Sequence, residues 1–120
     1  MADRMLLISW GAPVRGREEL GLEVFTDALG LLGRMQQEGR IESFDVALLR
    51  PNGDMNGFVI ARGSAAQIDA LQHDDEFVRS TADAMMIVDR LHHTEGYTNE
   101  GVAQQIEIYR AAIAKVSQRS

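Results

Sequence analysis

Two adjacent histidines, His92 and His93, are the residues of this chain best suited to acid–base chemistry. Imidazole titrates near neutral pH, so a histidine with a carboxylate nearby, such as Asp89 or Glu95, can act as a general base. Consecutive residues of a strand point to opposite faces, so at most one of the two imidazoles can enter a given cavity. The alternative is a pair of half-exposed histidines at a strand end, without chemistry.

A carboxylate and a guanidinium, Asp45 and Arg62, form a second candidate pair. A buried carboxylate in apolar surroundings can have a raised pKa and take part in proton transfer. The same pair can instead form an ion pair that holds two subunits together. The candidate catalytic residues are therefore Asp45, Arg62, His92 and His93. The candidate ligand-binding residues are Trp10, Asn56, Phe58 and Ile60, although a lone tryptophan is also a common core residue.

Motifs for metals and cofactors are lacking in the sequence. The chain contains no cysteine, which excludes disulfides, thiolate catalysis and cysteine-bound metals. No H-x-H, H-E-x-x-H or phosphate-loop spacing occurs. His73 precedes Asp74 and Asp75 and suggests a His-Asp dyad, but helix capping by the aspartates explains the same residues. We expect no metal and no cofactor.

Length, composition and charge favour a small globular protein. The chain has 120 residues, of which 45% are hydrophobic and 25% charged, as is usual for one globular domain. The formal net charge of -6 argues against nucleic acid and anionic membranes as partners. The N-terminal apolar run is too short for a signal core or a membrane span. We expect a cytoplasmic protein.

The order of apolar patterns predicts the fold. The first half of the chain predicts a strand at Met5–Trp10, a helix from about Arg17, and a hairpin over Ile41–Gly63 that turns at Pro51–Asp54. The second half predicts a second helix that a capping box opens at Ser64, a fourth strand at Met86–Leu91 and a final helix at about 99–118. This is βαββαβ plus a helix, a ferredoxin-like α+β fold with a four-stranded antiparallel sheet. We expect a single domain, 1–120, with its core at about 4–98.

The hairpin divides its residues between two faces if Arg50 lies opposite Met55. One face then carries Phe44, Val46, Leu48, Gly57, Val59 and Ala61, and suits helix packing. The other carries Ser43, Asp45, Ala47, Leu49, Asn56, Phe58, Ile60 and Arg62. This second face is too apolar to remain in water. We therefore expect a homodimer that covers it; the alternative is that the final helix folds back over it.

The chain resembles the dimeric α/β-barrel superfamily, which includes antibiotic-biosynthesis-monooxygenase-like, EthD-like and YCII-like proteins. The resemblance covers about residues 4–98. It depends on the element order, on the strand opening MLLISWG, and on LQHDDEFVRS, which is similar to an L-x-x-D-x-x-F pattern of that group. It implies two sheets facing each other around a cavity.

Two hypotheses follow. The first is a cofactor-independent enzyme, monooxygenase-like or isomerase-like, that acts on a small hydrophobic molecule in a cavity on the sheet. The second is a non-catalytic module that binds a ligand or stabilises a partner. A connected pocket of a few hundred cubic ångströms that reaches Asp45 or a histidine would favour the first.

Overall fold

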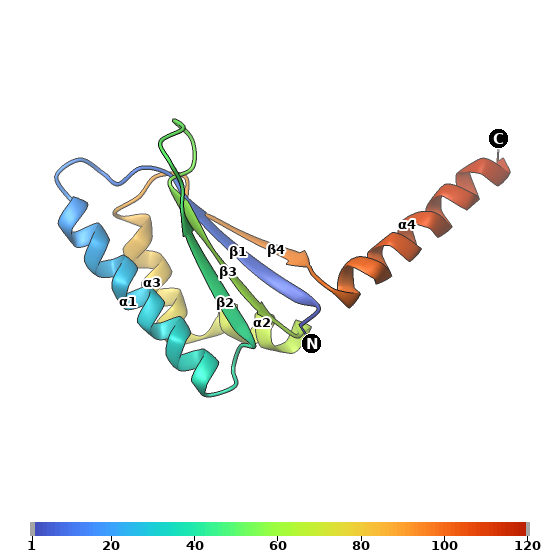
Figure 1. Ribbon diagram of the computed structural model, residues 1–120, viewed down its shortest axis with the longest axis horizontal. Coiled ribbons are helices and arrows are strands. Elements are labelled where there is room, and N and C mark those ends of the chain that lie inside the picture. The colour runs from blue at the N-terminus through green and yellow to red at the C-terminus, as the bar shows by residue number, and fades with distance from the viewer. Residues whose placement is uncertain (1, 120) are drawn as a thin grey trace.

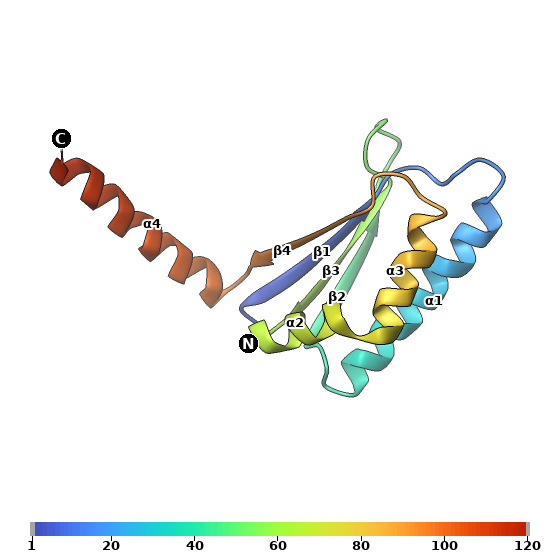
Figure 2. The same ribbon diagram turned by 180° about the vertical axis from the view of Figure 1, so that it is seen from behind.

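A four-stranded antiparallel sheet with strand order β2-β3-β1-β4 is the centre of the molecule. The computed structural model describes residues 2–119. Its elements are β1 (Arg4–Trp10), α1 (Glu18–Gln37), β2 (Ser43–Leu48), β3 (Gly57–Gly63), α2 (Ala65–His73), α3 (Asp75–Met85), β4 (His92–Tyr97) and α4 (Glu100–Arg119). Helices α1 and α3 lie side by side on one side of the sheet (Figure 1 and, from behind, Figure 2). The predicted ferredoxin-like α+β fold is confirmed.

Local capping explains where α2 and α3 begin. Ser64 accepts a hydrogen bond from the Gln67 backbone, and the Gln67 side chain accepts one from the Ser64 backbone, which is the predicted capping box. Asp74 has an extended backbone and accepts a hydrogen bond from the Phe77 N–H, so it ends α2 and begins α3. The helix capping expected of the aspartates after His73 is thus made by Asp74, at a change of direction between two helices.

The β2–β3 hairpin has the predicted turn and register. Asn52 organises the turn: its side-chain oxygen accepts hydrogen bonds from the backbone of Asp54 and Met55. Gly53 adopts a φ of 76°, which glycine allows without strain. The pairing of Ser43 with Arg62 places every second residue of both strands on the face predicted for it.

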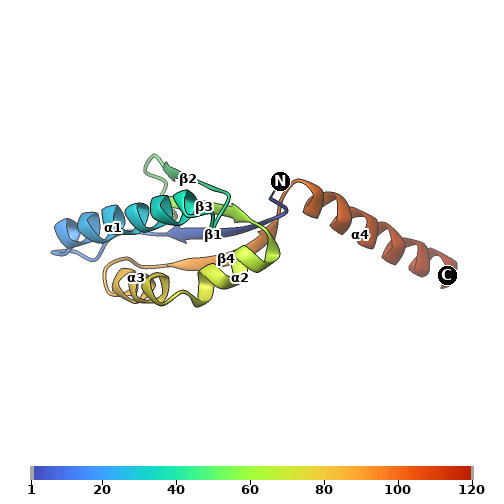
Figure 3. The ribbon, with the colours of Figure 1, turned by 90° about the horizontal axis from the view of Figure 1, so that it is seen from below.

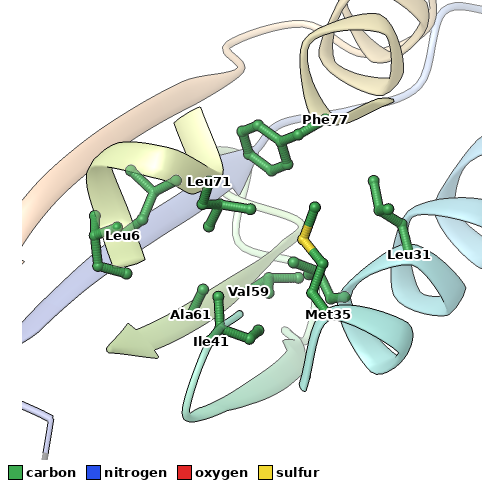
Figure 4. Close-up of a cluster of buried hydrophobic side chains, with 10 residues drawn as sticks. Leu6, Leu31, Met35, Ile41, Val59, Ala61, Leu71 and Phe77 are labelled. Atoms are coloured by element: carbon green, nitrogen blue, oxygen red, sulfur yellow. The ribbon is translucent and has the colours of Figure 1, made fainter. Parts of the chain in front are cut away.

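The hydrophobic core lies between this sheet and its helices (Figure 4). The cluster contains Leu6, Leu31, Leu32, Met35, Ile41, Val59, Ala61, Ile68, Leu71 and Phe77. Leu6, Val59 and Ala61 come from the sheet and alternate with residues that point to the opposite face. Only one face of the sheet is therefore covered by the chain's own helices.

The predicted strand at Met86–Leu91 is wrong, because β4 begins at His92. Ile87 and Val88 donate backbone hydrogen bonds to Ala84 and continue the end of α3 as a turn. Ile87 is apolar because it is buried in this turn, and not because it belongs to a strand. The true β4, HHTEGY, is an edge strand and is mostly exposed, so its polar sequence lacks the apolar alternation of a covered strand. The two histidines thus begin β4.

Helix α4 extends away from the rest of the molecule (Figures 1 and 3). The Cα radius of gyration is 17.3 Å, whereas a compact domain of this length has about 14 Å. The alternative in which the final helix folds back over its own sheet is wrong. The face of the sheet opposite α1 and α3, called the open face below, remains uncovered by this chain.

Candidate functional site

An apolar cavity of about 320 Å³ lies between the sheet and helices α1 and α3. From the sheet and its flanking loops it is lined by Ile8, Trp10, Pro13, Leu48, Val59, Ile87, Val88, Leu91 and His93. From the helices it is lined by Glu18, Gly21, Leu22, Val24, Phe25, Ala28, Leu29, Leu31, Leu32, Phe77, Ser80, Thr81 and Ala84. Several lining residues are small or remain exposed, so the helices do not fill the space above the sheet.

Trp10 forms one wall of the cavity at the end of β1. It contacts Phe25 of α1 edge to face, with ring centroids 5.5 Å apart. Gly57 makes room for the indole, since a Cβ there would lie 2.7 Å from Trp10 Cζ2 and 2.7 Å from the Ala47 carbonyl oxygen. A glycine in the strand therefore allows an aromatic ring to lie close to the sheet.

His93 is the one ionisable group that the sheet contributes to the cavity. It pairs with Ile8 in the sheet, and its ring lies 5.5 Å from the ring of Phe77 in the core. Desolvation lowers the pKa of His93 below its ordinary value of 6.5 although the side chain keeps contact with solvent. This shift favours the neutral form of the imidazole.

The ring nitrogens of His93 are free to serve a ligand. Within the described part of the chain, no side chain or backbone group is hydrogen-bonded to the imidazole ring of His93. Thr81, a threonine of the cavity wall on α3, donates to the Phe77 carbonyl at 2.9 Å. A neutral imidazole without a partner can accept a hydrogen bond or a proton from a bound molecule.

The other candidate catalytic residues lie on the open face. Arg62 donates a hydrogen bond to Asp45, so these two residues form an ion pair across β2 and β3. His92 pairs with Ser9 and points to the face opposite His93. The structure brings Asp45 and Arg62 together and separates both of them from His93.

The candidate ligand-binding residues are divided in the same way. Trp10 lines the cavity. Phe58 and Ile60 alternate with the buried Val59 and lie on the open face. Asn56 ends the hairpin loop, where its backbone N–H donates to the Trp10 carbonyl at 2.8 Å. Only Trp10 and His93 of the eight predicted site residues line the cavity.

Sequence reasoning missed the helix side of the sheet as a place for a ligand. The residues that it missed are Phe25, Ala28, Phe77 and Ala84. A signal was present: small residues recur on the buried side of α1 and α3, at Gly21, Ala28 and Ala84. Periodicity assigns such positions to the core, and it does not reveal whether neighbouring side chains fill the space they leave.

The contacts of His73 and of the neighbouring Asp74 are those of residues that stabilise helix ends. Its Nδ1 lies 2.8 Å from the carbonyl oxygen of Asp69 one turn earlier. Asp74 caps α3 and binds Arg40, which lowers the pKa of the Asp74 carboxyl. Among the described residues, no three His, Asp or Glu side chains are placed to hold a metal ion.

Comparison with solved structures finds the same fold at low sequence identity. A dimeric protein of unknown function with a ferredoxin-like fold from Bacteroides fragilis matches with a TM-score of 0.63 and 10% identity, over 82% of this chain and 98% of its own. A candidate antibiotic biosynthesis monooxygenase from Chloroflexus aurantiacus matches with a TM-score of 0.55 and 13% identity, over 80% and 93%. SnoaB, a cofactor-independent oxygenase from Streptomyces nogalater, matches with a TM-score of 0.51 and 13% identity, over 82% and 93%.

These likenesses concern the fold. No protein-family model matches the chain, and no curated protein matches it. The structural neighbours include ferredoxin-like proteins that are monooxygenase-like and others whose function is unknown. None of the described helices is long and apolar enough to cross a membrane.

Proposed function

We propose that the chain binds a small, apolar, preferably aromatic molecule in the cavity between the sheet and helices α1 and α3. The observation that carries this proposal is an apolar cavity of about 320 Å³ that is bordered by the imidazole of His93. Small-molecule sites are typically clefts of roughly 300–1,000 Å³ with few polar groups. The aromatic rings of Trp10, Phe25 and Phe77 favour a flat ligand.

The proposed chemistry is proton abstraction by His93. A hydroxyl or an acidic C–H of the bound molecule would donate its proton to the neutral imidazole, and the apolar walls would exclude water from the resulting anion. Such an anion is the starting point for an isomerase-like or a cofactor-independent monooxygenase-like reaction. The likeness to SnoaB, a cofactor-independent oxygenase, supports the second of these.

A non-catalytic ligand-binding module is the second candidate. It is favoured by the isolation of His93. Glu95, on the same face of β4, accepts a hydrogen bond from Gln72, and Asp45 lies on the other face of the sheet. Both candidate functions use the same cavity, and they differ only in whether the bound molecule is converted to a product. Binding is therefore the first property to test.

We further infer that two copies of the chain pair through the open face. That face carries Leu7, Phe58 and Ile60, which the chain's own helices leave uncovered. The likeness to the dimeric Bacteroides fragilis protein supports this pairing. The Asp45–Arg62 ion pair would then lie in the interface between the two copies. Asn56 and His92 would lie at the margin of that interface, where they form a second candidate ligand contact besides the cavity. The cytoplasmic location stays a prediction.

Binding can be followed through Trp10, the only tryptophan of the chain. The experiment titrates N-phenyl-1-naphthylamine, a neutral aromatic fluorescent probe, into the full-length protein and records probe emission and Trp10 quenching. We expect saturable binding with about one site per chain. Ala84→Phe fills the cavity and should weaken binding by about tenfold or more.

Ala82→Phe is the matched control. It introduces the same ring on the same helix at an exposed position that does not line the cavity. Ala82→Phe should bind the probe like the unmodified chain. Equal binding by both variants would show that the probe binds elsewhere and would refute the proposal.

A further inference from the structure

Helix α4 carries an apolar stripe that the rest of the chain leaves uncovered. The stripe consists of Val102, Ile106, Tyr109, Ile113 and Val116, each between 43% and 69% exposed. Successive members are four, three, four and three residues apart, which is the spacing of a seam between two helices. The helix has few contacts with the rest of the chain, and these include β4 and, at Gly101 in the first turn, the backbone of Asp3.

The surface area of the chain indicates what covers this stripe. The chain exposes 8156 Å², whereas a compact monomer of 13.3 kDa exposes about 6,500 Å². The excess of about 1,700 Å² is the amount that one subunit buries in a large, permanent interface. Both the open face and the α4 stripe contribute to this excess, so one second copy of the chain can account for both.

The charges of α4 favour a particular orientation of that second copy. Glu100 and Glu107 lie in the first half of the helix, and Arg110 and Lys115 lie in the second half. An antiparallel pair of α4 helices brings each acidic half beside a basic half, whereas a parallel pair brings like charges together. Exposed ion pairs contribute little stability, but they discriminate between orientations. Two-fold symmetry requires such a self-complementary surface.

We propose that α4 is an arm that packs through its apolar stripe against α4 of a second copy, in antiparallel orientation. This inference builds on the homodimer proposed above and adds a second, separate contact to it. Tyr109, the central residue of the stripe, then lies near the two-fold axis and faces its own counterpart. Val116 lies near the end of the helix and faces the start of the other one.

Cysteine cross-linking tests this geometry directly, because the natural chain contains no cysteine. Three single variants of the full chain are oxidised mildly and separated by non-reducing electrophoresis. Tyr109→Cys should form a disulfide-linked dimer in high yield. Val116→Cys should not, because its counterpart lies about 20 Å away along an antiparallel pair, at 1.5 Å per residue. Ala111→Cys, on the opposite side of the helix, should not either.

The outcomes separate the arm from the rest of the dimer. Cross-linking at both 109 and 116 indicates parallel helices and refutes the proposed orientation. A sedimenting dimer without cross-linking at 109 leaves the open-face pairing intact and refutes the arm. A monomer in sedimentation refutes both. The cavity proposal is independent of all three results.

A pair of charged variants provides a second test. Ile106→Glu combined with Ile113→Glu places charge on the stripe and should raise the dimer dissociation constant by about tenfold or more. Gln104→Glu combined with Ala111→Glu adds charge on the opposite side of α4 and should leave it within about twofold. Equal dissociation constants for the two double variants would overturn the arm.

Discussion

The two faces of the sheet carry different chemistry, although their residues alternate along the same strands. The helix-covered face has the core, the cavity and His93, whose environment is apolar. The open face has the Asp45–Arg62 ion pair and His92. The difference shows that the Asp45–Arg62 pair lies apart from the space suited to a ligand, which lies inside one chain and is bordered by a single ionisable group of the sheet.

The largest expected difference between the faces concerns stability. Leu6 is fully buried on the helix-covered face, and Leu7 lies next to it on the open face. Leu6→Ala should lower the free energy of unfolding by about 2–5 kcal/mol, because it leaves a cavity in the core. Leu7→Ala should cost less, since its side chain is only partly buried within one chain. Urea denaturation at a dilution that separates subunits measures both. Equal losses would contradict the division into a core face and an open face.

Two strand glycines provide the next comparison. A Cβ at Gly57 would meet the Trp10 ring and a backbone carbonyl at 2.7 Å, whereas a Cβ at Gly96 would meet Met5 Cγ at 3.4 Å, an ordinary contact. Gly57→Ala should lower the free energy of unfolding by about 1–3 kcal/mol and shift Trp10 fluorescence. Gly96→Ala should leave the Trp10 emission maximum unchanged. A Gly57→Ala variant with native emission would argue against the close contact that forms the cavity wall.

The Asp45–Arg62 pair should contribute little to the fold of a single chain. The Asp45 side chain is 69% exposed, and exposed ion pairs typically contribute about 0–1 kcal/mol. Asp45→Asn should therefore change the free energy of unfolding of the dilute chain by less than about 1 kcal/mol. Thermal unfolding in low and high salt checks this. A large, salt-insensitive loss would indicate that the pair is buried.

The smallest expected effect is the pH dependence of stability that His93 gives to the helix-covered face. The pKa of His93 is lowered in the folded chain, so the unfolded chain binds more protons below its own pKa of about 6.5. With respect to His93, the free energy of unfolding therefore has its full value above about pH 6.5 and decreases as the pH falls below that value. His93→Gln should flatten this acidic loss in a denaturation series from pH 7.5 to about 5. An acidic loss as steep in His93→Gln as in the unmodified chain would oppose this assignment.

The fold was predictable because its local signals agree with one another. The capping box at Ser64, the cap at Asp74 and the turn at Asn52 and Gly53 each act through hydrogen bonds between near neighbours, which sequence patterns record. The fourth strand was not predictable by the same means. It is an exposed edge strand without apolar alternation, and the apolar Ile87 beside it attracted the strand prediction.

The candidate site was predictable only in part. Strand alternation correctly placed Asp45 and Arg62 on one face and separated His92 from His93. It could not show that α1 and α3 leave space above Val59 and Trp10, because a cavity depends on how side chains from distant elements fit together.

The most direct test of the cavity is to ask which face of the sheet a ligand contacts. Two-dimensional ¹H–¹⁵N NMR of the labelled chain, titrated with N-phenyl-1-naphthylamine, reports each backbone amide separately. The cavity predicts saturable shifts at residues of its wall, including the Trp10 indole, Phe25 and Ala84, with little change at Ile60 and Arg62. Shifts confined to Ile60, Arg62 and their open-face neighbours would contradict the account.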